Sequence, residues 1–230
     1  MPTSAERLAR VEAVLFDLDG TLIDTVELIL TSFRHATRVV LGESLPDEVM
    51  MAGVGMPLRQ QMHDFSPEHA DELLRVYREH NAEAHDRMVH EYPGTEAVLT
   101  ELQRRGMPMG VVTSKGTPMT LRGLRLFGLE RFFGVVVTAD DVPLHKPDPY
   151  PLRHAAELLG VGIERCVYVG DSPHDMEAAR ASRAVAVAAL WGAFGAEAVL
   201  APGPDFAIAS LPELLPLLDG GGCDASHRNS

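Results

Sequence analysis

The chain has 230 residues, 46% of them hydrophobic, which is enough to bury a full core and a small second domain. Its formal net charge of −13 leaves no basic footprint of the kind that nucleic-acid-binding proteins carry, so we expect no DNA or RNA partner. No apolar stretch reaches the roughly 18 residues that span a bilayer, and no secretory signal is evident, so we expect a cytoplasmic protein without a membrane partner.

The first predicted element is a strand at residues 11–16, followed by a helical block from about residue 24 to residue 91. Within this block, apolar residues recur with helical spacing at 26–40 and at 73–88, and glycines and a proline interrupt the stretch 51–62. After Tyr92-Pro93-Gly94 helices and strands alternate. We predict strands at 108–113, 133–138, 166–170, 184–189 and 205–209, and helices near 95–105, 118–127, 149–159, 173–181 and 212–218.

This alternation predicts an α/β fold, in which a parallel sheet is covered by helices on both faces and is interrupted by the helical block. The two cysteines, Cys166 and Cys223, do not make a disulfide framework, in agreement with an intracellular location.

The most informative stretch runs from Val14 to Leu22, where an apolar strand ends in two carboxylates, Asp17 and Asp19. Residues i and i+2 of a strand point to the same side, so these acids repel each other unless a positive charge lies between them. A hard cation such as Mg²⁺ prefers oxygen ligands of this kind, and Gly20 then lets the chain turn. The alternative is an ordinary acidic turn.

Three later apolar runs also end in polar side chains. The hydroxyls of Thr113 and Ser114 can donate to phosphate oxygens or cap a helix. Lys146 stands between two prolines, as a phosphate-binding charge or as part of a surface turn. Asp171 and Asp175 follow the last run, as metal-binding acids or helix caps. Because ligands bind outside the carboxyl ends of parallel strands, we expect the four clusters to converge.

In this order the four segments resemble the motifs of the haloacid dehalogenase superfamily of phosphohydrolases. The matching residues are Asp17-Leu18-Asp19-Gly20-Thr21, then Thr113 or Ser114, then Lys146, and finally Gly170-Asp171 with Asp175. The resemblance implies a Rossmann-like catalytic core formed by residues 1–22 and 92–219, with an all-α cap at 23–91 inserted after the first motif. Residues 220–230 are polar and Gly-rich and are predicted to be a disordered tail.

The resemblance also implies the role of each residue. Asp17 is the nucleophile that forms an aspartyl-phosphate, and Asp19 is first the general acid and then the general base. Mg²⁺ is expected at the side chain of Asp17, the backbone carbonyl of Asp19 and Asp171, and Asp175 assists indirectly or orients Lys146. The phosphate oxygens are expected to be bound by Thr113 or Ser114, by Lys146, and by the N–H of Leu18 or Gly20.

The cap is expected to select the substrate. On an ideal helix Arg78, Asn81 and His85 fall within roughly a 60° arc and can bind a second anionic group, and the alternative is a solvated helix face. Arg59 lies in the loop that faces the substrate in the superfamily, where it can bind a carboxylate or a second phosphate. The segment 77–86 is similar to the bacterial pyrophosphatase branch of the phosphoglycolate phosphatase-like group.

The sequence therefore predicts a Mg²⁺-dependent phosphatase that hydrolyses a small phosphorylated metabolite, of the phosphoglycolate type, or inorganic pyrophosphate. Asp19 argues against haloalkanoate dehalogenation, which needs no general acid. A sugar-phosphate mutase of the β-phosphoglucomutase type needs the same four motifs and stays an alternative, as do a non-catalytic binding member and a chance match of motifs. We expect a small-molecule phosphate as substrate and a monomer or weak homodimer.

Overall fold

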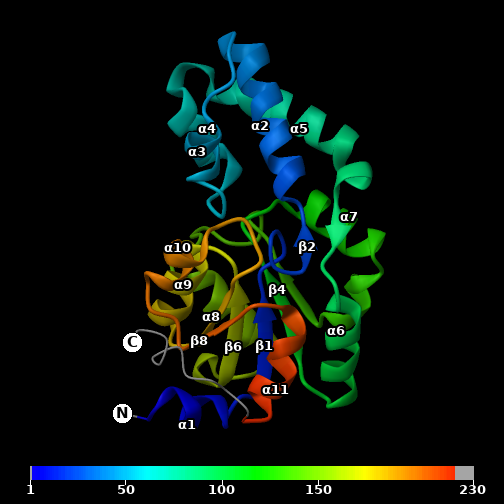
Figure 1. The fold of residues 1–230 in the computed structure, drawn as a ribbon, viewed down its shortest axis with the longest axis vertical. Helices are drawn as coiled ribbons and strands as arrows, with labels where there is room; N and C mark the ends of the chain where they lie inside the picture. Colours follow the sequence, from blue (N-terminus) through cyan, green and yellow to red (C-terminus); the bar gives the residue numbers. More distant parts are fainter. Residues whose placement is uncertain (1, 221–230) are drawn as a thin grey trace.

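The computed structural model describes residues 2–220, and its centre is a six-stranded sheet whose neighbouring strands are all parallel (Figure 1). The spatial order is β5-β4-β1-β6-β7-β8. The strands are β1 (Ala13–Phe16), β4 (Met109–Val112), β5 (Val135–Val137), β6 (Cys166–Gly170), β7 (Val185–Ala189) and β8 (Phe206–Ile208). The predicted α/β class is confirmed. Of the predicted tail, residues 221–230 lie outside the part of the chain that the structure describes.

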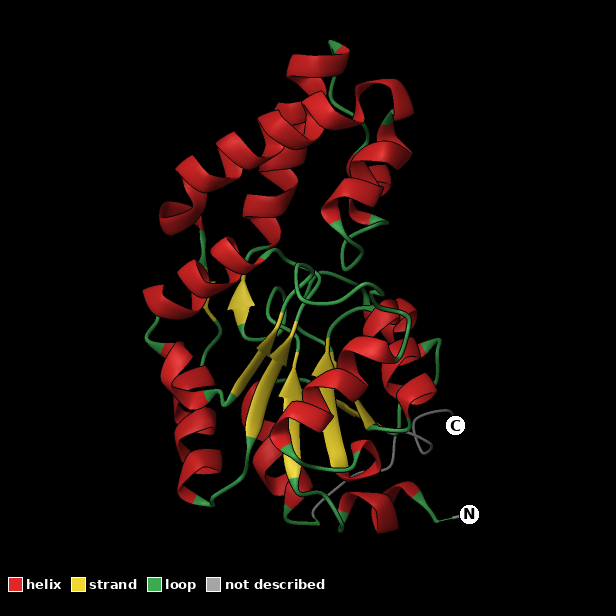
Figure 2. Cartoon of the chain, turned by 180° about the vertical axis from the view of Figure 1, so that it is seen from behind, coloured by secondary structure: helices red, strands yellow, loops and turns green. Residues whose placement is uncertain are grey.

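The central strand β1 is buried on both faces of the sheet. Val14 and Phe16 pack into one apolar cluster and Ala13 and Leu15 into another, because successive side chains of a strand point to opposite sides. Helices cover both faces, as seen from behind in Figure 2. The first cluster includes side chains of α1 (Ser4–Leu8), α6 (Thr95–Arg104), α7 (Thr117–Leu126) and α11 (Leu214–Leu218), and the second those of α8 (Tyr150–Leu159), α9 (Pro173–Ser182) and α10 (Ala196–Leu200). Short 3₁₀ turns lie at η2 (Leu129–Phe132), η3 (Ile163–Arg165) and η4 (Leu211–Glu213).

The helical block has its own apolar core, separate from the two clusters of the sheet. Its elements are α2 (Val26–Leu41), α3 (Asp47–Met51), α4 (Leu58–Phe65), η1 (Pro67–His69) and α5 (Ala70–Met88). Phe33, Met62 and Tyr77 belong to this core. The helices lie beyond the carboxyl ends of the strands, at the top of Figure 1. The interrupted stretch 51–62 resolves into the end of α3 and most of α4, with the loop between them.

A small antiparallel ribbon, which the sequence did not predict, joins the two places where the chain leaves and re-enters the sheet region. It consists of β2 (Ile23–Asp24) and β3 (His90–Glu91). On this geometry we propose a core of residues 1–22 and 92–219 and a helical cap of residues 23–91. Among the helices of residues 2–220, none combines the length and the apolar character that a membrane crossing requires.

Candidate active site

The carboxyl ends of the central strands bring the four sequence clusters to one edge of the sheet. Asp17 follows β1, and its backbone N–H donates to the Val169 carbonyl at 2.9 Å. Thr113 follows β4 and donates its N–H to the Val137 carbonyl, also at 2.9 Å. Asp171 follows β6. The predicted convergence is therefore seen in the structure, since adjacent parallel strands end at the same edge.

Lys146 is a buried cation at the centre of this edge. Its side chain is 1% exposed, and Nζ lies 2.6 Å from Asp175 Oδ1 and 3.1 Å from Asp17 Oδ1. Nζ also donates to the Tyr168 hydroxyl at 3.0 Å. Burial by itself lowers the pKa of Lys146, but the neighbouring carboxylates Asp17 and Asp175 raise it above its usual value. Lys146 therefore stays charged at neutral pH.

Asp175 holds that cation in place. Its Oδ1 accepts from Lys146 Nζ at 2.6 Å and from the Tyr168 hydroxyl at 2.9 Å, and its Oδ2 accepts from the N–H and the hydroxyl of Ser172 at 3.0 and 2.6 Å. Burial raises the pKa of Asp175, but the ion pair with Lys146 and these hydrogen bonds lower it overall. Because both oxygens are engaged, the geometry favours the role of orienting Lys146 over direct metal binding.

Three buried carboxylates, Asp17, Asp171 and Asp175, offer oxygen atoms that all lie within 4.8 Å of one another. Burial raises the pKa of Asp17 to about 7, with Lys146 opposing the shift and the charges of Asp175 and Asp19 adding to it. Burial and the charges of Asp175 and Asp17 raise the pKa of Asp171 well above its usual range. A divalent cation among these oxygens would relieve the repulsion, so the donor set fits a hard metal ion.

Asp171 is held on several sides. Its carboxylate accepts from the Thr21 hydroxyl at 3.1 Å and from the Ala193 N–H at 2.7 Å. A Cβ built on Gly20, whose φ is +81°, or on Gly192 would come within 2.2 Å of Asp171 Oδ2. Both positions therefore require glycine for the carboxylate to lie where it does.

Asp19 has a partner to which the sequence analysis assigned no role. The Lys115 ammonium donates to Asp19 Oδ1 at 2.7 Å, and the two side chains are 14% and 16% exposed. Tyr168 and Thr21, which contact Asp175 and Asp171, were missed as well. The signal available for Lys115 was its place directly after Ser114.

A cavity of about 680 Å³ opens between the cap and this edge of the sheet. Its core-side lining includes Asp17, Asp19, Thr113, Ser114, Lys115, Lys146 and Asp171. Ser114 Oγ is buried and forms no hydrogen bond with any group in residues 2–220. From the cap, Arg59, Arg78 and Asn81 line the same cavity. The predicted residues Leu18 and Gly20 lie in the loop after β1, next to Asp17 and Asp19.

The cap candidates differ in their surroundings. Arg59 is 70% exposed and pairs with Asp71 at 2.6 Å. Asn81 is buried, and its amide donates to Ser32 Oγ and the Tyr77 hydroxyl at 3.3 and 3.4 Å. His85 lies outside the lining of the large cavity. It is fully buried, with Nδ1 2.8 Å from Asp86 Oδ1.

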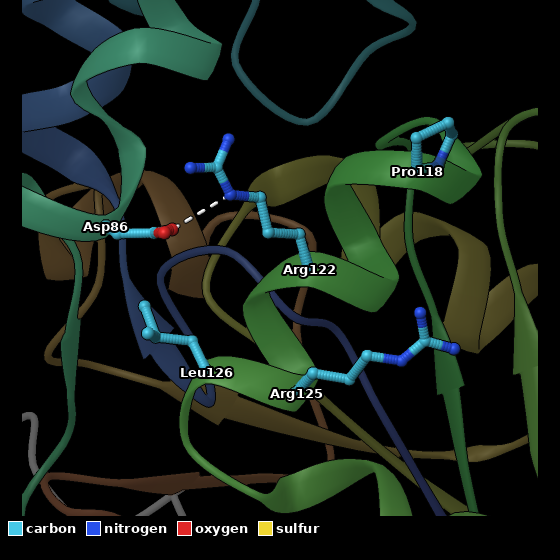
Figure 3. A pocket seen from close by; sticks show the side chains of 5 residues that line it. All are labelled: Asp86, Pro118, Arg122, Arg125 and Leu126. Atoms are coloured by element: carbon cyan, nitrogen blue, oxygen red, sulfur yellow. Dashed lines mark hydrogen bonds and ion pairs between the residues drawn. The ribbon is translucent and has the colours of Figure 1, made fainter.

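A second, shallower hollow of about 400 Å³ lies where α5 meets α7 (Figure 3). In the figure the Arg122 guanidinium reaches from α7 toward Asp86 at the end of α5, with an Nε–Oδ1 distance of 2.9 Å. Arg122 also donates to the Ala82 carbonyl at 2.7 Å. Arg125, the other cation there, pairs with Glu130 at 2.8 Å. Both guanidinium groups are therefore engaged within the protein, and the Arg122 contacts join α7 to α5 across the hollow.

Residues 14–189 match the family model of the haloacid dehalogenase-like hydrolases. The chain belongs to this family. The pyrophosphatase PpaX of Bacillus velezensis is 38% identical over 206 residues, which cover 90% of this chain and 95% of that protein. The PpaX of Halalkalibacterium halodurans is 35% identical over 208 residues, covering 90% and 97%. The chain is therefore a hydrolase of the haloacid dehalogenase superfamily.

Solved structures agree with this membership. A hydrolase from Pseudomonas syringae superposes with a TM-score of 0.82 at 25% identity, and the match covers 92% of this chain and 100% of that chain. A structure described as a predicted phosphoglycolate phosphatase, from Haemophilus somnus, also has a TM-score of 0.82, at 22% identity and with 90% and 98% coverage. At that identity the second match shows the fold alone. The resemblance to the haloacid dehalogenase superfamily is thus confirmed.

Proposed function

We propose that this hydrolase is a Mg²⁺-dependent phosphatase that cleaves inorganic pyrophosphate, with Asp17 as the nucleophile. The observation that carries the proposal is the position of Asp17: it is buried at the cavity floor, with Lys146 Nζ 3.1 Å from its Oδ1 and the carboxylates of Asp171 and Asp175 beside it. The full-length similarity to proteins named pyrophosphatase PpaX supports pyrophosphate as substrate.

Asp17, Asp171 and the backbone carbonyl of Asp19 would hold the ion, because a hard cation prefers oxygen ligands. When bound, Mg²⁺ would neutralise part of the negative charge of the carboxylates and of the phosphate. Without such a cation, the repulsion between the carboxylate and the phosphate would be large. Two unit charges of like sign about 4 Å apart repel by about 4 kcal/mol at an effective dielectric constant of about 20. That energy corresponds to roughly a thousandfold in rate. Lys146, buried against Asp17, contributes the fixed positive charge of the protein itself.

In the proposed reaction a carboxylate oxygen of Asp17 attacks phosphorus, and the bond from phosphorus to the leaving oxygen breaks. Asp19 protonates that oxygen and later removes a proton from the water that hydrolyses the aspartyl-phosphate. Thr113, Ser114 and Lys146 donate to the oxygens of the transferred group, together with the N–H of Leu18 or Gly20. The buried and unpartnered Ser114 Oγ supports this, because a phosphate oxygen would satisfy it.

On the cap side, we propose that Arg59, Arg78 and Asn81 face the leaving group, since all three line the cavity. His85 is assigned no substrate contact, because it packs against α7 outside that lining.

A small phosphate monoester is the second candidate substrate. The lining of the cavity also includes apolar side chains that pyrophosphate would not use, among them Ile29, Phe33, Met56 and Phe194. Such a lining suits the carbon skeleton of an organic phosphate.

The test is kcat/KM for pyrophosphate and a panel of small phosphate monoesters, measured with Mg²⁺ and with EDTA. Asp17→Asn should lower turnover by at least about 10⁴-fold, because the nucleophile is lost. Asp64→Asn, on the exposed side of α4, is the matched control and should retain full activity. Turnover by Asp17→Asn at the wild-type level would refute the covalent mechanism.

Two further outcomes separate the alternatives. Isomerisation of a sugar phosphate that depends on a bisphosphate activator would indicate a mutase. Binding of phosphates without turnover of any panel member would indicate a non-catalytic protein.

A further inference from the structure

Lysine is rare in this chain, and both lysines lie at the candidate active site. Of the 20 basic residues two are lysines, Lys115 and Lys146, and the remaining 18 are arginines. Each lysine is ion-paired with an aspartate of the first motif: Lys146 with Asp17 at 3.1 Å and Lys115 with Asp19 at 2.7 Å. An ammonium is a compact charge on a flexible stem, whereas a guanidinium is a rigid planar fork. The two positions therefore suit charges that bind single oxygen atoms.

The two lysines differ in how firmly they are held. Lys146 is 1% exposed and also contacts Asp175 and Tyr168. Lys115 is 14% exposed, and within residues 2–220 Asp19 is the only side chain with which its ammonium forms a hydrogen bond or ion pair. An ammonium has three N–H donors, so Lys115 can bind a ligand in the cavity that it lines.

The backbone of Lys115 is fixed while its side chain projects into the cavity. Its N–H donates to Thr113 Oγ1 at 3.2 Å, and its carbonyl accepts from the Ala139 N–H at 3.0 Å. The four-carbon stem alone then sets the reach of the ammonium. Where the ammonium lies in the structure, against Asp19, it can bind ligand atoms that approach Asp19.

We propose that Lys115 is a specificity-determining residue that binds the leaving group of substrates in which that group carries anionic oxygens of its own. The inference rests on the proposed function, in which Asp19 serves the leaving oxygen and Asp17 receives the transferred group. Lys146, against Asp17, then faces the transferred phosphoryl group, and Lys115, against Asp19, faces what departs.

The electrostatics of the site support this division. The chain carries a net charge of −13, and Asp17, Asp19 and Asp171 all line the cavity. A second phosphate that enters this cavity needs local positive charge, and Lys115 supplies it beside Asp19 on the core side, in addition to Arg59 and Arg78 on the cap side. A phenyl leaving group brings no anionic oxygen beyond the scissile one and makes no such demand. Lys115 therefore favours a diphosphate over a simple ester.

Lys115→Met tests the inference by comparing pyrophosphate with p-nitrophenyl phosphate. The variant should lose about 10- to 100-fold more kcat/KM for pyrophosphate than for the ester, which is the range for one hydrogen bond to a charged group. Arg125→Met, an exposed residue of α7 that pairs with Glu130 outside the large cavity, removes the same charge and should leave the ratio unchanged. Lys115→Arg, which keeps the charge, should restore part of the preference. Equal losses on both substrates in Lys115→Met would overturn the inference.

A second measurement does not depend on turnover. Acetic anhydride acetylates exposed amines, and peptide mass spectrometry reads Lys115 separately from Lys146. With Mg²⁺ present, imidodiphosphate should slow the acetylation of Lys115, whereas orthophosphate should not. Equal protection by orthophosphate would place Lys115 on the transferred group and would refute its assignment to the leaving group. A wild-type protein that hydrolyses neither substrate would refute the proposed function instead, and the protection experiment would still decide whether Lys115 binds a diphosphate.

Discussion

Replacing Gly192 by alanine tests how closely the activity depends on the position of Asp171. A Cβ at residue 192 would stand 2.2 Å from Asp171 Oδ2 and 2.3 Å from Asp171 Cβ. Ordinary contacts of a Cβ begin at 3.4 Å, so Asp171 and the backbone of residue 192 must move apart by about 1 Å, and we expect Asp171 to take part in that shift. Rotation of the side chain alone does not remove the overlap, because Asp171 Cβ is part of it.

The expected loss follows from that displacement. Disturbing the position of a metal ligand typically costs 10- to 100-fold in affinity, so the Mg²⁺ concentration for half-maximal activity should rise by about that factor. The corresponding free energy is about 1.4 to 2.7 kcal/mol. A misplacement of about 1 Å can also cost roughly 100-fold in rate, so kcat at saturating Mg²⁺ should fall as well.

The assay is a Mg²⁺ titration of p-nitrophenyl phosphate hydrolysis by the wild type and the variant. Gly195→Ala is the matched control, because a Cβ there meets no heavy atom within 4 Å and the residue belongs to the same loop. Melting temperatures in EDTA show whether both variants remain folded. Half-maximal activity of Gly192→Ala at the wild-type Mg²⁺ concentration would refute the argument that this contact fixes Asp171 in a position that the metal requires.

Two other predictions concern stability. Tyr168→Phe removes the buried hydroxyl that contacts Asp175 and the Val112 carbonyl. Urea titration should therefore show a loss of about 1–2 kcal/mol in the free energy of unfolding, and an unchanged free energy would contradict this prediction. Burial lowers the pKa of His85 below its value in the unfolded chain, so the unfolded state binds more protons and stability is lost as pH falls from about 7 through the folded pKa. His85→Gln should therefore show a smaller drop in Tm between about pH 7.5 and about pH 5.5 than the wild type, and an equal drop would exclude His85 as a cause.

Most of the fold could be predicted because its signals are local. The strand ending at Phe16 is a short apolar run followed by acids and a glycine, and the later strands are also short apolar runs with helical segments between them. Parallel strands separated by helices end at one edge, so Asp17, Thr113 and Asp171 could be placed together without coordinates. The β2–β3 ribbon could not be predicted, since each of its strands is two residues long and forms only by pairing with the other.

The sequence by itself determined which side chains stand at the ends of the strands, because strand and turn preferences act between neighbouring residues. Only the tertiary structure decided which of them touch. It paired Lys115 with Asp19 across 96 positions, joined Lys146 to Asp175 and Tyr168, and turned His85 toward α7 rather than into the cavity. Such contacts depend on how separate elements pack, and the spacing of residues along the chain carries no record of them.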